Sequence, residues 1–417
     1  MQIPFSSPDL SEQEIEQVIQ VLRSGWITTG PRTAAFEKKI SEYCGTTHTV
    51  CMNSATSAME ITLRLLGIGP GDEVITSAYT FTATAAVIEH VGAKIVLADT
   101  APDSFRMDPA QLREKITPRT KAVIPVDIGG VMCDYDRIAE VIREKQHLFV
   151  PGENRYQRAF SRPVIIADAA HSFGAVRGGV RSGAAADFTC FSFHAVKNLT
   201  TADGGAVTWI SHDEINNTAL YRDYKLISLH GQNRDPVFRD RTDLWEYDVT
   251  MTGYKCNMTD IAAVIGLAQL ERYDGMLARR KEIVRQYDRA LLPLGIRRLE
   301  HFGEDQEGNA HLYMVRIPWI GEEERNRIIR EMSERGIRCN VHFKPLPMLT
   351  AYRRMGFRTE DYPNAFRQYR NEITLPLYSQ LRPEQADYVT GQFTEILAKV
   401  RPNEREEIFG TGSSKVG

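Results

Sequence analysis

The sequence lacks the features that mark a membrane protein or a disulfide-stabilised secreted protein. No apolar run reaches the roughly 18 residues that a membrane-spanning helix needs. The first ten residues are polar and contain proline, so they do not resemble a signal peptide. Only six cysteines occur among 417 residues, and they show no metal-ligand spacing. We therefore expect a cytoplasmic protein with reduced thiols, no membrane association and no bound metal.

An excess of one charge is also missing. The chain has 51 lysine and arginine residues against 54 aspartate and glutamate residues, for a formal net charge of −3. No overall field therefore attracts nucleic acid or an anionic membrane. A Gly-x-Gly-x-x-Gly segment after a strand, typical of nicotinamide-dinucleotide binding, is absent too. An anionic ligand must then be bound by a local site.

What the sequence does contain is an alternation of short apolar segments and helical patterns. A first helix is predicted to begin at a capping box formed by Ser11 and Glu14, and it should end at Gly25. Nearly all-apolar strands that alternate with helices predict an α/β sheet covered on both faces, which binds ligands at the carboxyl ends of its strands. The predicted strands are 49–52, 73–76, 94–98, 121–126, 163–167, 187–192 and 205–209, and the helices between the early ones are 57–66, 83–90 and 134–145.

The pattern of predicted helices and strands changes after about residue 258. A long helix is predicted over 260–292, followed by a smaller α/β unit with strands at 312–317 and 338–343 and a last helix at 383–399. We therefore expect a large domain with an N-terminal arm (1–258), a small C-terminal domain (259–402) and a disordered tail (403–417). Residues 147–163 interrupt the alternation and predict a surface insertion, either inert or in contact with substrate.

Three polar segments follow predicted strands. Lys197 lies beyond an apolar strand and before a glycine pair, although a lone loop lysine is usually just solvated. Asp168 ends another strand, where a carboxylate can cap a helix, bind a metal or face a pyridine nitrogen. Residues 53–58 join a strand to a helix with small side chains, which is either an ordinary N-cap or a phosphate site at a helix N-terminus.

Taken together, these segments resemble those of a known enzyme family. The chain is similar to the DegT-type (DegT/DnrJ/EryC/StrS) sugar aminotransferases, a branch of the fold-type I pyridoxal 5′-phosphate (PLP) enzymes. The resemblance covers about residues 3–400. The segments that carry it are 192–198 (SFHAVKN), 253–260 (GYKCNMTD), 69–75 (GPGDEVI), 24–30 (SGWITTG) and 341–343 (VHF).

The resemblance implies a role in binding PLP for each matching residue. Lys197 would bond covalently to the cofactor, and Asp168 would pair with its protonated pyridine nitrogen. His171 would lie near the 3-hydroxyl group, and Phe81 would stack on the ring. The phosphate site is expected at Ala55, Thr56 and Ser192.

The same resemblance implies partners and architecture. Lys255 would reach the cofactor phosphate from the other subunit, so a homodimer with shared active sites is expected. Our candidates for contacts with the amino-group acceptor are Trp26, Thr28, His342 and residues 147–163. The fold would be a seven-stranded, mostly parallel sheet sandwiched by helices, plus a smaller C-terminal α/β domain.

The implied activity moves an amino group from glutamate to a keto sugar, with the amine of Lys197 as general base. The favoured acceptor is a nucleotide-linked 4-keto-6-deoxy sugar, in amino-sugar biosynthesis for a surface polysaccharide, glycan or antibiotic. A cyclitol aminotransferase would keep every catalytic residue, and a PLP-binding regulator would keep the binding site. Related sugar dehydratases have histidine in place of the lysine, so Lys197 argues against that activity.

Overall fold

The central element of the fold is a seven-stranded sheet. The computed structural model describes residues 1–233 and 246–400. Six strands of the sheet run parallel and β9 runs antiparallel to both its neighbours. Their order is β1 (His48–Met52), β9 (Gly205–Trp209), β8 (Phe188–Ser192), β5 (Val164–Asp168), β4 (Thr120–Ile124), β2 (Glu73–Ser77) and β3 (Lys94–Ala98). The predicted mixed, mostly parallel sheet is confirmed.

Successive side chains of the strands enter two separate hydrophobic cores. Val74 and Ile124 belong to one core, whereas Ile75 and Val123 belong to the other. Because strand side chains alternate between faces, both faces of the sheet must be covered by helices. The first core includes residues of α3 (Ala55–Leu65), α4 (Thr82–His90), α7 (Arg155–Phe160), α8 (Asn217–Ser228) and α12 (Pro363–Tyr369); the second includes residues of α2 (Pro31–Cys44), α5 (Pro109–Lys115), α6 (Tyr135–Glu144) and α9 (Asp260–Leu291).

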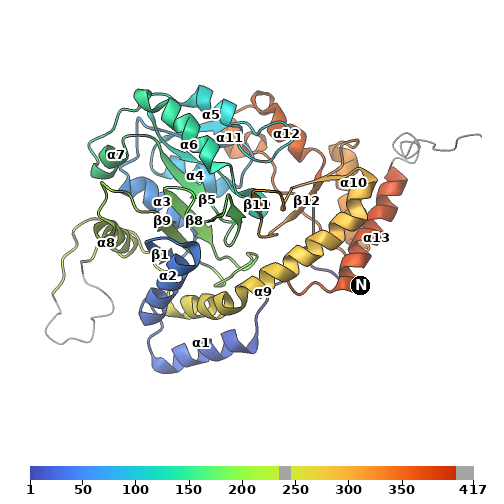
Figure 1. The fold of residues 1–417 in the computed structure, drawn as a ribbon, viewed down its shortest axis with the longest axis horizontal. Helices are drawn as coiled ribbons and strands as arrows, with labels where there is room; N and C mark the ends of the chain where they lie inside the picture. The colour runs from blue at the N-terminus through green and yellow to red at the C-terminus, as the bar shows by residue number, and fades with distance from the viewer. Residues whose placement is uncertain (234–245, 401–417) are drawn as a thin grey trace, which may run out of the picture.

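Helix α9 links this sheet to a C-terminal unit with its own core. The helix starts beside α1 (Glu12–Ser24) and α2 and runs out along α13 (Pro383–Val400), as Figure 1 shows. The third core packs the far half of α9 and α10 (Glu322–Glu334) against a three-stranded sheet of β10 (Arg297–Arg298), β12 (Tyr313–Arg316) and β13 (Glu372–Leu375). In a second small sheet, β6 (Val176–Arg177) lies between β11 (Gln306–Glu307) and β7 (Val180–Arg181). Helix α11 (Thr350–Arg354) lies between β12 and β13 in the sequence.

The predicted first helix is confirmed, with its boundaries fixed by local chemistry. The Ser11 amide donates to the Glu14 carboxylate at 2.7 Å, and Gly25 adopts a left-handed conformation (φ 74°) that ends the helix. The predicted strand over 338–343 is wrong. That segment forms only a single bridge, between Asn340 and Thr374. Phe343 packs against Phe81 instead of entering a sheet, with the two ring centroids 5.8 Å apart.

The prediction of a surface insertion at 147–163 is correct only in part. The segment contains α7, whose Tyr156, Gln157 and Phe160 are buried. The Gln157 side chain donates to the Leu66 carbonyl at 2.8 Å, and the Asn154 side chain donates to the Leu65 carbonyl at 3.0 Å. The segment therefore satisfies carbonyls at the end of α3. The predicted disordered tail (403–417) lies outside the described residues. The boundary between the two domains stays a prediction.

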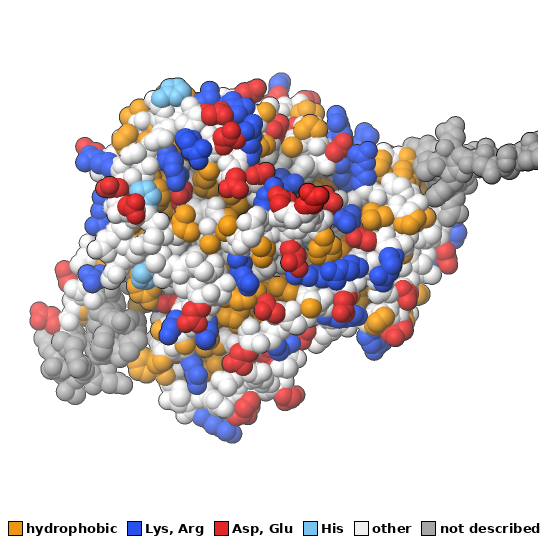
Figure 2. Space-filling model, viewed as in Figure 1, with side chains coloured by type: hydrophobic (Ala, Val, Ile, Leu, Met, Phe, Trp, Pro, Cys, Tyr) orange, Lys and Arg blue, Asp and Glu red, His pale blue; other side chains and the backbone are white. Residues whose placement is uncertain are grey.

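The surface carries interspersed charges. Figure 2 shows acidic and basic side chains mixed across the face that it presents, as the balanced composition suggests. All six cysteines are unpaired, and all except Cys339 are buried. In residues 1–233 and 246–400, no helix is both long enough and apolar enough to cross a bilayer.

Candidate active site

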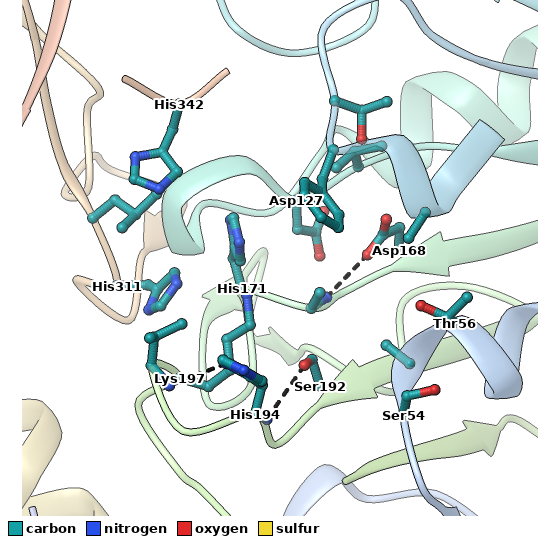
Figure 3. Close-up of a pocket in the computed structure, with 18 of the residues that line it drawn as sticks. Ser54, Thr56, Asp127, Asp168, His171, Ser192, His194, Lys197, His311 and His342 are labelled. Atoms are coloured by element: carbon teal, nitrogen blue, oxygen red, sulfur yellow. Dashed lines mark hydrogen bonds between the residues drawn. The ribbon is translucent and has the colours of Figure 1, made fainter. Parts of the chain in front are cut away.

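A cavity of about 380 Å³ lies at the carboxyl ends of the strands. This is the edge at which parallel α/β sheets bind ligands. One wall, here called the strand-end wall, consists of residues at the carboxyl ends of strands or in the loops that follow them: Ser54, Ala55, Thr56, Phe81, Asp168, Ser192 and Lys197. The opposite wall, here called the C-terminal wall, consists of His311, His342 and Phe343. Figure 3 shows Asp168 and Thr56 across the cavity from His311 and His342.

Asp168 is the buried carboxylate of the strand-end wall. It is the last residue of β5, and its two oxygens accept hydrogen bonds from the Thr84 hydroxyl (2.6 Å) and the Ala170 amide (3.2 Å). Burial raises the pKa of Asp168, while these bonds and the nearby Lys197 favour the ionised form. A fixed carboxylate in this position can stabilise a cation in the cavity.

Lys197 projects into the cavity from the loop after β8. The loop is anchored by distant residues, because the Thr200 amide donates to Gln269 of α9 (2.9 Å) and the Asn198 side chain donates to the Asn309 carbonyl (2.9 Å). Burial lowers the pKa of Lys197 to about 8, although Asp168 acts in the opposite direction. An amine with a pKa near neutrality can both take up and release a proton.

The N-terminus of α3 forms the third part of the strand-end wall. The Ser54 hydroxyl caps the helix by accepting from the Ser57 amide at 3.0 Å, and Ser54, Ala55 and Thr56 all line the cavity. Gly205 lies directly behind them, where a Cβ atom would come within 2.3 Å of the Ser54 carbonyl carbon. Glycine is therefore required there, and the free amides and dipole of the helix end favour an anion such as a phosphate.

The cavity also contains three imidazole rings that are held neutral. His171 lies 4.5 Å from His311 between ring centroids, and burial lowers the pKa of both rings well below the usual value. The Gly129 amide donates to Nδ1 of His171 at 3.2 Å, so the proton of this ring must be on Nε2. Burial and the charge of Lys197 lower the pKa of His342 to about 3.

Three residues assigned by resemblance do not line this cavity in the described part of the chain. Trp26 donates to the Thr29 carbonyl at 3.1 Å, the Thr28 carbonyl accepts from the Asp260 amide at 3.1 Å, and Lys255 contacts Asn257. Residues 147–163 do not reach the cavity either. By contrast, Ala55, Thr56, Phe81, Asp168, His171, Ser192, Lys197 and His342 all line it, as Figure 3 shows for the labelled ones.

Sequence reasoning missed several residues of the site, and Thr84 and His311 show why. Thr84 bonds to Asp168 from α4, and His311 bonds through Nδ1 to the Asn198 side chain at 2.9 Å. Thr84 lies in an ordinary helical pattern, and His311 lies just before a strand, so neither had a local signal. Only the approach of distant segments gives these side chains a place in the site.

Comparison with known proteins identifies the family. The model of the DegT/DnrJ/EryC1/StrS aminotransferase family matches residues 8–394. This chain belongs to that family. The spore coat polysaccharide biosynthesis protein SpsC of Bacillus subtilis is 36% identical over 401 residues, which cover 95% of this chain and 97% of SpsC.

Solved structures of aminotransferases support the same family. The PLP form of the "Putative sugar aminotransferase Spr1654 from Streptococcus pneumoniae" has a TM-score of 0.93 and 48% identity, covering 96% of this chain and 100% of that chain. Helicobacter pylori PseC, an aminotransferase involved in the biosynthesis of pseudaminic acid, has a TM-score of 0.81 and 26% identity, covering 96% and 100%. The predicted family, PLP fold-type I and cofactor are confirmed.

The residues of the cavity fit PLP. The cavity offers an anion-binding helix end at α3, a buried carboxylate at Asp168 and an amine at Lys197. These three groups complement a phosphate, a pyridine nitrogen and an aldehyde. When bound, PLP supplies the electron sink for transamination. The protein is a PLP-dependent aminotransferase.

Proposed function

We propose that this enzyme transfers an amino group from glutamate to a nucleotide-linked 4-keto-6-deoxy sugar in the cytoplasm. The product would serve amino-sugar biosynthesis for a surface polysaccharide, glycan or antibiotic. The observation that carries the proposal is the convergence of Lys197, Asp168 and the N-terminus of α3 on one cavity. The names of SpsC and Spr1654, which refer to polysaccharide biosynthesis and to a sugar aminotransferase, support the sugar acceptor.

In this proposal, Lys197 holds the cofactor covalently and then carries the proton that moves between substrate carbon and cofactor. A carrier must release the proton as readily as it takes it up. The pKa of about 8 that burial gives the Lys197 amine supports this role, because both protonation states are then accessible near neutral pH.

Asp168 is proposed to keep a proton on the pyridine nitrogen. Its bonds from Thr84 and Ala170 fix the carboxylate, and no rearrangement is needed when positive charge arises beside it. His171 is proposed to donate from Nε2 to the 3-hydroxyl oxygen, which the Gly129 bond to Nδ1 supports. Phe81 lines the cavity and is 57% exposed, and it is proposed to cover one face of the cofactor ring.

We propose that Ala55, Thr56 and Ser192 bind the phosphate, with a cation from a second subunit. Among the described residues that line the cavity, Lys197 is the single lysine or arginine. A phosphate dianion therefore gains little charge compensation from its own subunit. Lys255 is the proposed partner, so the enzyme would be a homodimer with shared active sites.

The positions of Trp26, Thr28 and Lys255, which do not line the cavity of their own subunit, support this arrangement. The Thr29 hydroxyl donates to the Met258 carbonyl at 2.6 Å, and the Asp260 amide donates to the Thr28 carbonyl. These bonds join the segment of Trp26 and Thr28 to the segment of Lys255. We therefore propose that the three residues form one surface that completes the partner's cavity, with Trp26 and Thr28 next to the sugar.

The acceptor is tested by incubating the PLP-loaded enzyme with glutamate and a panel of keto sugars while 2-oxoglutarate is measured. The panel includes nucleotide-linked 4-keto-6-deoxy sugars, nucleotide-linked 3-keto sugars and keto-inositols. Turnover should be at least tenfold faster with a nucleotide-linked 4-keto-6-deoxy sugar than with the others. Faster turnover of a keto-inositol would replace the proposal by a cyclitol aminotransferase, and the Lys197→Ala variant provides the blank.

A further inference from the structure

A buried carboxylate outside the cavity is connected to it by hydrogen bonds. Glu372 of β13 is fully buried (0% exposed) and does not line the cavity. One of its oxygens accepts from the His342 backbone amide at 2.9 Å, and the other accepts from the Thr374 hydroxyl at 2.5 Å. The Thr374 oxygen lies 2.9 Å from Nδ1 of His342. Glu372, Thr374 and His342 thus form a chain that ends at the C-terminal wall.

The direction of these bonds fixes where His342 carries its proton. Thr374 has one hydroxyl proton, and while Glu372 is ionised that proton is donated to it. The Thr374 oxygen must then accept from Nδ1 of His342. The other ring nitrogen, Nε2, is left without a proton, and Figure 3 shows the His342 ring directed into the cavity. In this state His342 can only accept a hydrogen bond from a ligand.

A proton from the cavity reverses the whole chain. If Nε2 of His342 takes up a proton, the Nδ1 proton passes to the Thr374 oxygen and the Thr374 proton passes to Glu372. One proton has then left the cavity and one has appeared on Glu372, while the ring is neutral before and after. Nε2 now carries a hydrogen and donates to a ligand. Only O–H and N–H bonds are exchanged, so no further reactant is needed.

The charges around the chain favour this outcome over a charged ring. The pKa of His342 is lowered to about 3 by burial and by Lys197, whereas burial raises the pKa of Glu372 to about 8. A proton that enters through His342 is therefore held by Glu372.

The other groups that face the chain do not compete for the proton. Arg325 lowers the pKa of Glu372, but burial outweighs it. Tyr79 and Cys339 also face Glu372, and burial raises the pKa of both, so they stay neutral. His171 and His311 face the cavity side, and burial keeps them neutral as well.

We propose that Glu372 and Thr374 are positioning residues that switch the cavity-facing nitrogen of His342 between hydrogen-bond acceptor and donor. The inference rests on the proposed function, in which one cavity must bind two unlike substrates in turn. A glutamate carboxylate can only accept hydrogen bonds and requires the donor state. A hydroxyl group of the sugar substrate can donate and is bound by the acceptor state.

Two substitutions separate the states. In Glu372→Gln, the amide oxygen accepts from the His342 backbone and the NH₂ group donates to Thr374, which holds Nε2 of His342 protonated at every pH. Thr374→Val keeps the shape of the side chain and removes the link. Thr374→Ser restores the hydroxyl and is the matched control for the valine variant.

The first readout is the tautomer of His342 in the PLP-loaded enzyme, measured by nitrogen-15 NMR after selective labelling of histidine, with His342→Gln to assign the signal. In the parent enzyme Nδ1 should carry the proton at pH 9 and Nε2 at pH 6.5, without an imidazolium signal. Glu372→Gln should keep Nε2 protonated throughout, Thr374→Val should lose the pH dependence, and Thr374→Ser should retain it. A parent tautomer that does not change between these pH values overturns the proposal.

The second readout is the KM for glutamate in the half-reaction without a sugar acceptor. In the parent enzyme it should rise about fivefold from pH 8 to pH 9 as the donor state is lost, since Glu372 titrates with a pKa of about 8, and in Glu372→Gln it should stay constant. Equal rises in both enzymes contradict the switch. Because neither readout uses a keto sugar, an error in the proposed acceptor leaves both results unaffected.

Discussion

The two walls of the cavity are built in different ways. In the strand-end wall, Asp168 ends a strand, and Lys197 and the N-terminus of α3 lie within a few residues of a strand end, so a short stretch of sequence fixes each group. In the C-terminal wall, His311 is fixed by Asn198, which lies 113 residues earlier in the sequence. His342 is fixed by Thr374 of β13. The first wall carries charged groups and the second carries neutral rings. In the proposed function, cofactor chemistry and substrate recognition would therefore rest on separate parts of the chain.

The strongest test of the strand-end wall is Lys197→Ala. Without the amine, the rate of transamination should fall about 10⁴-fold or more, equivalent to roughly 5 kcal/mol of barrier. Borohydride should attach PLP covalently to the parent protein at Lys197 and to no residue of the variant, as read by peptide mass spectrometry. Covalent attachment at another lysine would move the catalytic role away from Lys197.

A smaller loss is expected for Asp168→Asn, which keeps the shape of the side chain and removes its charge. The turnover rate should fall about 10³-fold, or roughly 4 kcal/mol, because the pyridine nitrogen loses its counter-ion. The variant should still bind PLP through the phosphate site, as measured by absorbance after gel filtration. Thr84→Val provides a milder comparison, since it removes one bond to Asp168 and leaves the charge. Near-normal turnover of Asp168→Asn would exclude the proposed role.

The rate of PLP uptake by the apoenzyme should report the protonation of Lys197. Burial lowers the pKa of this amine to about 8, so the neutral, nucleophilic form decreases below that pH. The uptake rate, followed by absorbance, should fall about fivefold from pH 8 to pH 7 and about tenfold for each further pH unit. In Asp168→Asn the same profile should shift to lower pH, because the carboxylate that favours the ammonium form is gone. A profile centred near the ordinary lysine pKa would show that the amine is well solvated.

Shared active sites are tested by mixing Lys197→Ala with Lys255→Ala subunits. If Lys255 serves the neighbouring cavity, each mixed dimer has one doubly damaged site and one intact site. At equal amounts, activity should recover to about a quarter of the parent value, because half of the dimers are mixed and one site in each works. Lys255→Ala alone must first prove clearly impaired. A mixture that never exceeds the sum of its parents after verified subunit exchange would place Lys255 in its own subunit's site or in none.

The smallest effect is expected at residues 147–163, away from both walls. Asn154 caps α7 by accepting from the Tyr156 amide (2.8 Å) and donates to the Leu65 carbonyl (3.0 Å). Asn154→Ala should lower the free energy of unfolding by about 1 kcal/mol, measured with urea, while kcat/KM changes less than about twofold. Asn154→Asp retains the cap and should be less destabilised. A large change in KM would show that this segment contacts substrate.

The sequence alone determined the elements that depend on local chemistry. The capping box at Ser11, the apolar strands that end at Asp168 and Ser192, and the small residues before α3 each act within a few neighbouring residues. Because parallel strands end at one edge of the sheet, these local signals also determined that Asp168 and Lys197 would meet. The resemblance of the motifs to those of a known family then identified PLP as the cofactor.

Only the tertiary structure decided what the second wall would contain. The strand predicted over 338–343 failed because His342 and Phe343 are fixed by contacts with Thr374 and Phe81, and no pattern within the segment encodes them. The same holds for Glu372, whose carboxylate meets the His342 amide through the bridge between Asn340 and Thr374. Sequence periodicity reports which side a residue faces, whereas the partner that it meets depends on how distant segments pack.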